Sequence, residues 1–252
     1  MASIDGHTNT DPLARPATVL HRFIAILDAV KGAEGARSIA ELVAITGMPK
    51  STVFRLVSEL VEQRYLARAD GGVTLGLRLF ELGARAVLPR RILSVAAPTV
   101  RGLSERTGER VGLWVQQGLD MVSIAAVQGR LPMLSAHAGM RSPALTTASG
   151  KAFLAFCADQ SVVDRVSASL VDEDAERFRD ELVDVRTSVL ATDLGLSYRG
   201  VVAVASPIIA PDRTVLGAIS VAGPRDSMRV DNIAPLVRAA SLSLSRQLAA
   251  TA

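Results

Sequence analysis

Residues 38–57 read SIAELVAITGMPKSTVFRLV, and this stretch decides the fold of the N-terminal part of the chain. Ser38 suits the N-cap of a helix, and Glu41 three residues later completes a capping box, in which each side chain accepts a hydrogen bond from the other residue's backbone N–H. Gly47 ends this short helix in a tight turn, and Pro49 suits the first position of the next helix. Two helices joined by so short a turn predict a helix-turn-helix.

The flanking residues extend this motif on both sides. Apolar residues at helical spacing predict a preceding helix over 19–30, and the second helix of the motif is expected to run to about Arg64. Residues 65–68 and 73–75 have the composition of strands, and the Asp-Gly-Gly sequence at 70–72 is typical of a hairpin turn. A hairpin directly after the third helix predicts the wing of a winged helix-turn-helix.

Helical periodicity continues beyond the hairpin. It predicts a helix over 77–88 that stops at Pro89, and a second helix over about 91–107, in which Pro98 is a point of kinking. The apolar stripes on these segments suit two roles equally well, packing within one subunit or pairing of two subunits. The predicted domains are a flexible arm at 1–18, the winged helix-turn-helix at 19–76, a linker helix at 77–90 and a C-terminal domain at 91–252.

The C-terminal part changes to a mixed pattern of strands and helices. Strands are expected over 111–115, 121–127, 201–209 and 215–222, and helices over 149–158, 172–190 and 231–248. Because the strands are joined by short turns, they predict a largely antiparallel sheet. The predicted fold class is therefore α+β.

Composition limits the function without naming it. The 252 residues suffice for two domains, and a net charge of +3 permits nucleic-acid binding without requiring it. No apolar run approaches the roughly 18–20 residues that span a bilayer, and residues 1–16 do not resemble a signal peptide. A single cysteine, Cys157, excludes an intramolecular disulfide. We expect a cytoplasmic protein without a membrane partner.

No motif for catalysis or for a metal is found. The sequence lacks a G-x-S-x-G elbow, and the Gly150-Lys151 pair lacks the first glycine and the Ser or Thr of a phosphate-binding loop. Cys157 stands among apolar residues and is expected to be a buried structural thiol. Three histidines show no ligand spacing: His7, His21 and His137. We expect no enzyme activity, no metal and no cofactor.

Four stretches together resemble one family, the IclR-type (isocitrate lyase regulator) bacterial transcription factors. The stretches are 38–57, quoted above, TTASGKA at 146–152, GVVAVASP at 200–207 and LGAISVAGP at 216–224. They stand in the family's order and spacing over about 19–224. The resemblance implies a winged-helix domain, a linker helix that helps to pair subunits, a GAF-like effector-binding domain, a dimer or dimer of dimers, and no catalysis.

A recognition helix enters the major groove of double-stranded DNA with its N-terminal end, which favours small polar and basic residues there. Lys50 and Arg55 can donate hydrogen bonds to guanine or phosphate, and Ser51 and Thr52 can contact either. Arg68 on the hairpin is expected near the DNA backbone or minor groove. A dimer would require a palindromic operator. The alternative is that these residues are only solvated surface.

The family resemblance implies an effector pocket in the C-terminal domain. Its expected residues are Thr147, Ala148, Ser149, Gly150, Asp193, Val201, Ala203, Ser220 and Ala222. Ser149 and the amides near Gly150 would lie at a helix N-terminus, which suits a carboxylate, so a small organic acid is the expected effector. The alternative, that Ser149 only caps the helix, is equally open.

Several residues leave the pocket's role open. Residues 194–199, LGLSYR, replace a segment that is often acidic in the family, and Ala222 replaces a small polar residue. A regulator whose pocket has lost its ligand therefore remains an alternative. Lys151 is expected to cover the surface rather than balance an anion, and Trp114 is expected in the core rather than in the pocket.

Overall fold

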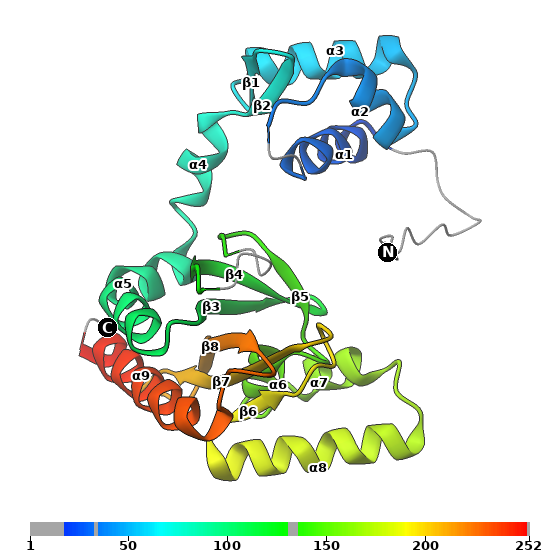
Figure 1. Ribbon diagram of the computed structural model, residues 1–252. Helices are drawn as coiled ribbons and strands as arrows, with labels where there is room; N and C mark the ends of the chain where they lie inside the picture. Colours follow the sequence, from blue (N-terminus) through cyan, green and yellow to red (C-terminus); the bar gives the residue numbers. More distant parts are fainter. Residues whose placement is uncertain (1–17, 33–34, 131–135, 251–252) are drawn as a thin grey trace. The chain divides into compact units, whose positions relative to one another are not determined.

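Helices α1 to α4 and one β-hairpin form the N-terminal unit in the computed structural model, which describes residues 18–32, 35–130 and 136–250 (Figure 1). The chain divides into two compact units, 1–86 and 87–252. The elements of the first unit are α1 (Val19–Lys31), α2 (Ile39–Thr46), α3 (Lys50–Glu62), β1 (Leu66–Ala69), β2 (Gly72–Leu75) and α4 (Leu77–Gly83).

The capping box predicted from the sequence is present at the start of α2. Ser38 Oγ accepts a hydrogen bond from the Glu41 backbone N–H at 3.2 Å, and Glu41 Oε2 accepts one from the Ser38 N–H at 2.9 Å. Gly47 ends the helix in the left-handed conformation, with φ of 66°. Pro49 takes the N-cap position of α3 rather than its first helical position. This turn directs α3 across α2 as a helix-turn-helix.

The hairpin is tied to the start of α2 by its backbone. Arg37 and Val73 exchange two backbone hydrogen bonds of 2.9 Å, which adds a short third segment to the hairpin. A Cβ on Gly72 would lie 2.0 Å from the Arg37 carbonyl oxygen, so only glycine allows this approach. Apolar side chains from α1, α2, α3 and the hairpin then close one core: Ile26, Ala29, Val30, Leu42, Val53, Leu56, Val57, Leu60, Leu66 and Val73.

The two helices after the hairpin differ from the prediction. Helix α4 ends at Gly83, and α5 spans Val87–Thr107, so the expected helix over 77–88 with a stop at Pro89 is wrong. Pro89 is the third residue of α5. Its missing N–H costs nothing there, because the first four amides of a helix have no intrahelical partner. The proline therefore lies in the first turn of a helix instead of ending one.

The C-terminal unit is built around a six-stranded antiparallel sheet of order β5-β4-β3-β8-β7-β6. The strands are β3 (Arg110–Gln117), β4 (Asp120–Val127), β5 (Arg141–Pro143), β6 (Ala191–Asp193), β7 (Val201–Ile209) and β8 (Val215–Pro224). The helices that follow α5 are α6 (Ala148–Leu154), α7 (Gln160–Ser167), α8 (Asp172–Ser188) and α9 (Val230–Ala250). The mixed α+β class and the antiparallel sheet expected from the sequence are confirmed.

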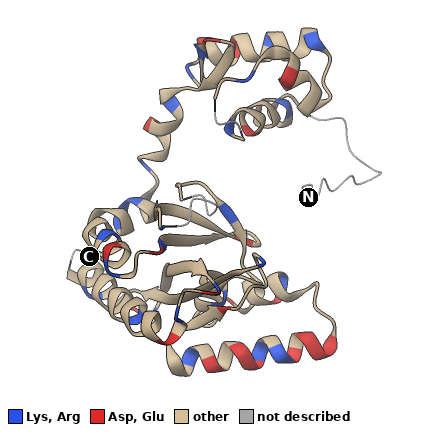
Figure 2. Ribbon diagram, viewed as in Figure 1, with Lys and Arg blue, Asp and Glu red and all other residues tan. Residues whose placement is uncertain are grey.

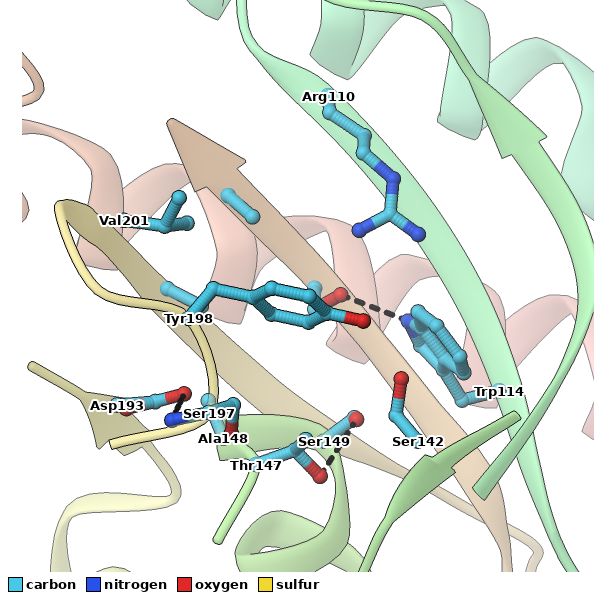
Figure 3. Close-up of a pocket in the computed structure, with 13 residues that line it drawn as sticks. Arg110, Trp114, Ser142, Thr147, Ala148, Ser149, Asp193, Ser197, Tyr198 and Val201 are labelled. Atoms are coloured by element: carbon cyan, nitrogen blue, oxygen red, sulfur yellow. Dashed lines mark hydrogen bonds between the residues drawn. The ribbon is translucent and has the colours of Figure 1, made fainter. Parts of the chain in front are cut away.

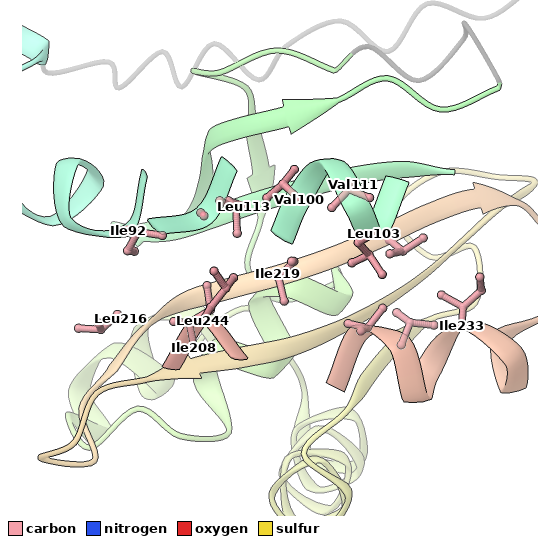
Figure 4. Packing of buried hydrophobic residues seen from close by; sticks show 14 of the residues in the cluster. Ile92, Val100, Leu103, Val111, Leu113, Ile208, Leu216, Ile219, Ile233 and Leu244 are labelled. Carbon is pink, nitrogen blue, oxygen red and sulfur yellow. The ribbon is translucent and has the colours of Figure 1, made fainter. Parts of the chain in front are cut away.

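Successive residues of the central strands point to opposite faces of the sheet, as strand geometry requires. Leu113 and Ile219 belong to the core that α5 and α9 cover, which Figure 4 shows. Trp114 and Ala218 belong to the core on the other face, under α6, α7 and α8. The sheet is thus the middle layer of three.

The prediction missed several short elements and the exact end of one helix. Strands β5 and β6 have three residues each, too few for an alternating pattern to be visible, and α7 was not expected. Helix α8 ends at Ser188 because Val189 adopts the left-handed conformation. Within the described residues, no helix is long and apolar enough to cross a membrane.

Candidate nucleic-acid interface and internal cavity

The first turn of α3 presents polar and basic side chains to solvent. Lys50, Ser51 and Arg55 are exposed and Thr52 is half-buried, while the buried residues of α3 face the core: Val53, Leu56, Val57 and Leu60. Among the described residues no side chain caps this helix, because Pro49 stands at the N-cap. The first amides of α3 are therefore open to an anion, and the partial positive charge of the helix N-terminus adds to the two cations.

Two further exposed residues lie on this unit. Arg68 extends from β1 of the hairpin into solvent. Phe54, which sequence reasoning did not single out, is 57% exposed on α3, next to Arg55 and three residues from Ser51. An exposed aromatic side chain on a recognition helix can contact a thymine methyl group. Its place on the polar face of the helix, outside the apolar stripe, was the sequence signal for it.

A small cavity of about 40 Å³, partly open to solvent, lies in the C-terminal unit, between the sheet, the start of α6 and the loop after β6 (Figure 3). This volume is enough for ordered water and too small for a ring-containing molecule. Its lining residues are Arg110, Trp114, Ser142, Thr147, Ala148, Ser149, Asp193, Ser197, Tyr198, Val201, Ala203, Ser220 and Ala222.

Eight of the nine residues predicted for the effector pocket line this cavity; the ninth, Gly150, does not. A Cβ on Gly150 would lie 2.0 Å from the Ala144 carbonyl oxygen. The glycine thus allows α6 to pack against the preceding backbone. Sequence reasoning missed Arg110, Ser142, Ser197 and Tyr198, and favoured the core over the pocket for Trp114.

The start of α6 differs from the expectation. Thr147 is the N-cap, and its Oγ1 accepts a hydrogen bond from the Gly150 N–H at 3.2 Å. Ser149 lies within the first turn, and its hydroxyl points back to Thr147 Oγ1 at 3.4 Å. The interpretation of Ser149 as the cap is therefore wrong, and the cap position that was considered for a carboxylate is already occupied.

Asp193 organises the loop that closes the cavity. Its Oδ1 accepts backbone hydrogen bonds from Gly195 at 3.0 Å and Leu196 at 2.8 Å, and its Oδ2 accepts one from Ser197 at 3.3 Å. The buried carboxylate is thus compensated by three amides. It positions the residues that lead to Tyr198.

Trp114 has both of the roles considered for it. The ring is buried in the core under α6, and the same ring lines the cavity. Its Nε1–H donates a hydrogen bond to Ser220 Oγ at 2.8 Å, drawn as a dashed line in Figure 3. The polar end of the indole is satisfied, so the ring is held in one orientation.

Arg110 is the cation of the cavity. Its side chain is 9% exposed, and the guanidinium lies 5.4 Å from the centre of the Trp114 ring. Burial lowers the pKa of this guanidinium, and the nearby Tyr198 opposes that shift. No sequence motif identifies Arg110 as a site residue; it is the first residue of β3.

Two other expectations about charged and sulfur groups are wrong. Lys151 is 3% exposed and forms an ion pair with Glu181 of α8, so it neither covers the surface nor faces the cavity. Cys157 is half-buried rather than buried, with Sγ 3.6 Å from the Asp159 carbonyl oxygen. In the described ranges, no group of His, Cys, Asp and Glu could hold a metal ion.

Comparison with known proteins identifies the family. A family model described as the C-terminal domain of the bacterial transcriptional regulator IclR matches residues 84–246, and one described as the IclR helix-turn-helix domain matches residues 19–70. The chain belongs to the IclR family of transcriptional regulators. It is therefore a DNA-binding regulator by family, and the resemblance expected from the sequence is confirmed.

Curated relatives and solved structures agree with this result. The HTH-type transcriptional regulator KipR of Bacillus subtilis is 27% identical over 85% of this chain and 90% of its own length. The repressor AllR of Escherichia coli is 27% identical over 88% and 86%. An IclR homologue from Microbacterium hydrocarbonoxydans, solved with 4-hydroxybenzoate, superposes with a TM-score of 0.82 at 24% identity, over 92% of this chain and all of that one. A regulator from Silicibacter is 31% identical, with a TM-score of 0.71 over 91% and 96%.

Proposed function

We propose that this IclR-family protein binds a palindromic operator through the start of α3 and that a small organic acid in the internal cavity changes its affinity for that DNA. The exposed N-terminal end of α3 carries the DNA-binding part of the proposal. Lys50 and Arg55 are free in solvent, on a helix end that no side chain caps among the residues described. Cations and open amides at one helix end fit a phosphate and the base edges beside it.

The remaining contacts follow from the same surface. Ser51 and Thr52 supply short hydroxyl side chains beside Lys50, suited to phosphate or base edges. Arg68 on the hairpin would contact the DNA backbone or the minor groove. The domains proposed for these roles are the winged helix-turn-helix at 19–76, the linker at 77–90 and the effector domain at 91–252.

Pairing of subunits is supported by exposed apolar side chains on α1 and α4. Leu20 is 68% exposed, and Leu77 and Phe80 are more than 70% exposed. Such residues are costly to leave in water and are typical of a surface that another subunit covers. A homodimer or a dimer of dimers would present two recognition helices, and its operator would have half-sites about one helical turn, or a multiple of it, apart.

The effector part of the proposal is supported by the cavity and by a structural relative. The lining combines apolar residues with a few polar groups, as small-molecule sites do. The Microbacterium homologue with the same fold was solved with 4-hydroxybenzoate, an organic acid. The protein would act in the cytoplasm by binding alone, without catalysis or a cofactor.

A second candidate is a constitutive regulator whose pocket no longer binds a ligand. The volume of about 40 Å³ favours it, because an aromatic acid needs more room. The two candidates differ in one result: only the first predicts that an organic acid changes the affinity for DNA.

DNA binding is tested by fluorescence anisotropy, with full-length protein and duplex DNA from upstream of its own gene. The variant K50A/R55A should bind about 100-fold more weakly, since each cation makes charge-assisted hydrogen bonds. Arg177→Ala, an exposed arginine on α8 in the other unit, is the matched control and should bind as the wild type does. Equal binding by K50A/R55A and the wild type would contradict the proposed interface.

A further inference from the structure

Arg110 is a buried cation without an anionic partner in the described part of the chain. Its Nε is fully buried and makes no hydrogen bond there, and Nη2 has only a weak contact with Met140 Sδ at 3.8 Å. Four ion pairs are formed within 18–32, 35–130 and 136–250, and none includes Arg110. Figure 2 shows that the central strands are almost free of charged residues, so a buried arginine is unusual in this part of the protein.

A buried guanidinium without a counter-ion is unfavourable, because it has lost its hydration, and the contact with the Trp114 ring at 5.4 Å offsets only part of that loss. Arg37 makes the comparison clear. Its Nε is also buried and unpaired, but its Nη1 donates to Glu41 Oε1 at 3.0 Å, so that cation has a carboxylate partner. Arg110 has instead a cavity in front of it (Figure 3).

We infer that Arg110 binds the carboxylate of a flat monocarboxylic acid that carries an aromatic ring. This inference rests on the proposed function and names the chemical class of its effector. A guanidinium presents parallel N–H groups that match the two oxygens of a carboxylate. The residues beside it include the Trp114 ring and the small apolar side chains of Val201 and Ala222, which suit a planar apolar body.

The other candidate anion site, the start of α6, is less suitable. Thr147 already caps this seven-residue helix. The Asp193 carboxylate lies at the same end of the cavity, away from Arg110 in Figure 3, and repels a second negative charge there. A ligand in this cavity therefore has one anionic end at Arg110 and an uncharged end towards α6. Such a ligand is a monocarboxylate rather than a dicarboxylate.

Room for the ring comes from Tyr198. Its side chain is 52% exposed, points into the cavity in Figure 3, and its hydroxyl makes no hydrogen bond with the described residues. A phenol held so loosely occupies the place where a ligand ring would lie. When the Tyr198 side chain turns outward, the cavity opens to a ring of the same size, and the acid replaces it.

The test measures binding of benzoate, benzamide and acetate to the full-length protein by isothermal titration calorimetry. Benzoate should bind the wild type, while benzamide, which is the same shape without charge, should bind about 10- to 100-fold more weakly. Acetate, which has the charge without the ring, should bind about as weakly. Equal affinity for benzoate and benzamide, or no binding of benzoate, would overturn the inference.

Variants assign the effect to the two residues. Arg110→Gln should lose the preference for benzoate over benzamide, whereas Arg106→Gln, an exposed arginine on α5, should keep it. Arg110→Lys should bind benzoate with intermediate affinity, because it keeps the charge and loses the fork. Tyr198→Ala should bind benzoate more tightly than the wild type. Unchanged preference in Arg110→Gln, or weaker binding in Tyr198→Ala, counts against the proposal.

DNA affinity is measured on the same samples without acid. The Arg110→Gln variant should bind DNA as the wild type does, because Arg110 lies in the other unit from α3. A protein that binds DNA but not benzoate contradicts only the inference about Arg110. A protein that binds benzoate but no DNA contradicts the proposed operator contacts.

Discussion

Lys50 and Arg55 at the start of α3 stand in solvent, whereas Arg110 at the start of β3 is buried beneath a loop. The first two cations keep their hydration until a partner arrives, so they destabilise nothing in the folded protein. Arg110 has lost its hydration already, and its pKa is lowered for that reason. The surroundings of a cationic side chain therefore decide whether it keeps its hydration or loses it in the folded protein.

The difference concerns range and selectivity. Exposed cations attract any polyanion over a distance, and salt weakens that attraction. A buried cation acts only on an anion that fits into its cavity, and salt screens it much less. Under the proposed function, one unit of this protein would find DNA, and the other would recognise one kind of small molecule.

The largest expected difference between the start of α3 and the cavity is in the salt dependence of their affinities for ligand. If Lys50 and Arg55 of two subunits contact phosphates, raising salt from about 50 to 200 mM should lower DNA affinity about 100-fold. Benzoate affinity should change about twofold or less over the same range, because the Debye length matters little inside a cavity. Fluorescence anisotropy measures the affinity for DNA, and isothermal titration calorimetry measures the affinity for benzoate. Parallel losses would show that Arg110 is not shielded from solvent.

Removing the wing cation should have the next largest effect. Arg68→Ala should weaken DNA binding about tenfold at every sequence tested and reduce the steepness of the salt dependence, as loss of a phosphate contact does. Arg179→Ala on α8, in the other unit, serves as its control. A change in sequence preference instead of overall affinity would place Arg68 on a base.

Replacing the buried cation should stabilise the protein in the absence of acid. Arg110→Met keeps much of the side-chain volume and removes an unpaired charge, so the free energy of unfolding should rise by about 1 kcal/mol or more. Thermal unfolding followed by circular dichroism measures this. A lower melting temperature would mean that the guanidinium is compensated in the folded protein.

The smallest effect is expected at the capping box. The Ser38 backbone N–H and hydroxyl donate to Glu41, and Arg37 lies beside it, so the pKa of the Glu41 carboxyl is lowered from 4.5. A lowered carboxyl pKa contributes stability above the unfolded value, and this contribution is lost as the pH falls below 4.5 towards the folded value. Glu41→Gln should therefore lose less stability than the wild type between pH 7 and pH 3.

Ser38→Ala removes the other half of the box and should cost about 1 kcal/mol at neutral pH. Urea unfolding of both variants measures these changes. If the free energy of unfolding depends on pH equally in Glu41→Gln and the wild type, Glu41 does not contribute to the loss of stability in acid.

Sequence reasoning located the helix-turn-helix, the hairpin and the four central strands, because their signals lie within a few residues of one another. The prediction was wrong at Pro89, because a proline is compatible both with the end of one helix and with the first turn of the next. Only the position of α5 decides which of these two places Pro89 takes. For the cavity, the resemblance to a family supplied eight lining residues. Arg110 and Tyr198 carried no motif, so they were missed.

The start of α3 was fixed by local chemistry: a capping box, a left-handed glycine and a proline stand within twelve residues, and each acts on its neighbours. The cavity was decided by strand register. Gly112 pairs with Ser220 and Ala203 with Ala222, which brings Arg110, Trp114 and the loop of Tyr198 together from segments far apart in the chain. Such pairing depends on the burial of both faces of the sheet at once, and no short stretch of sequence contains that information.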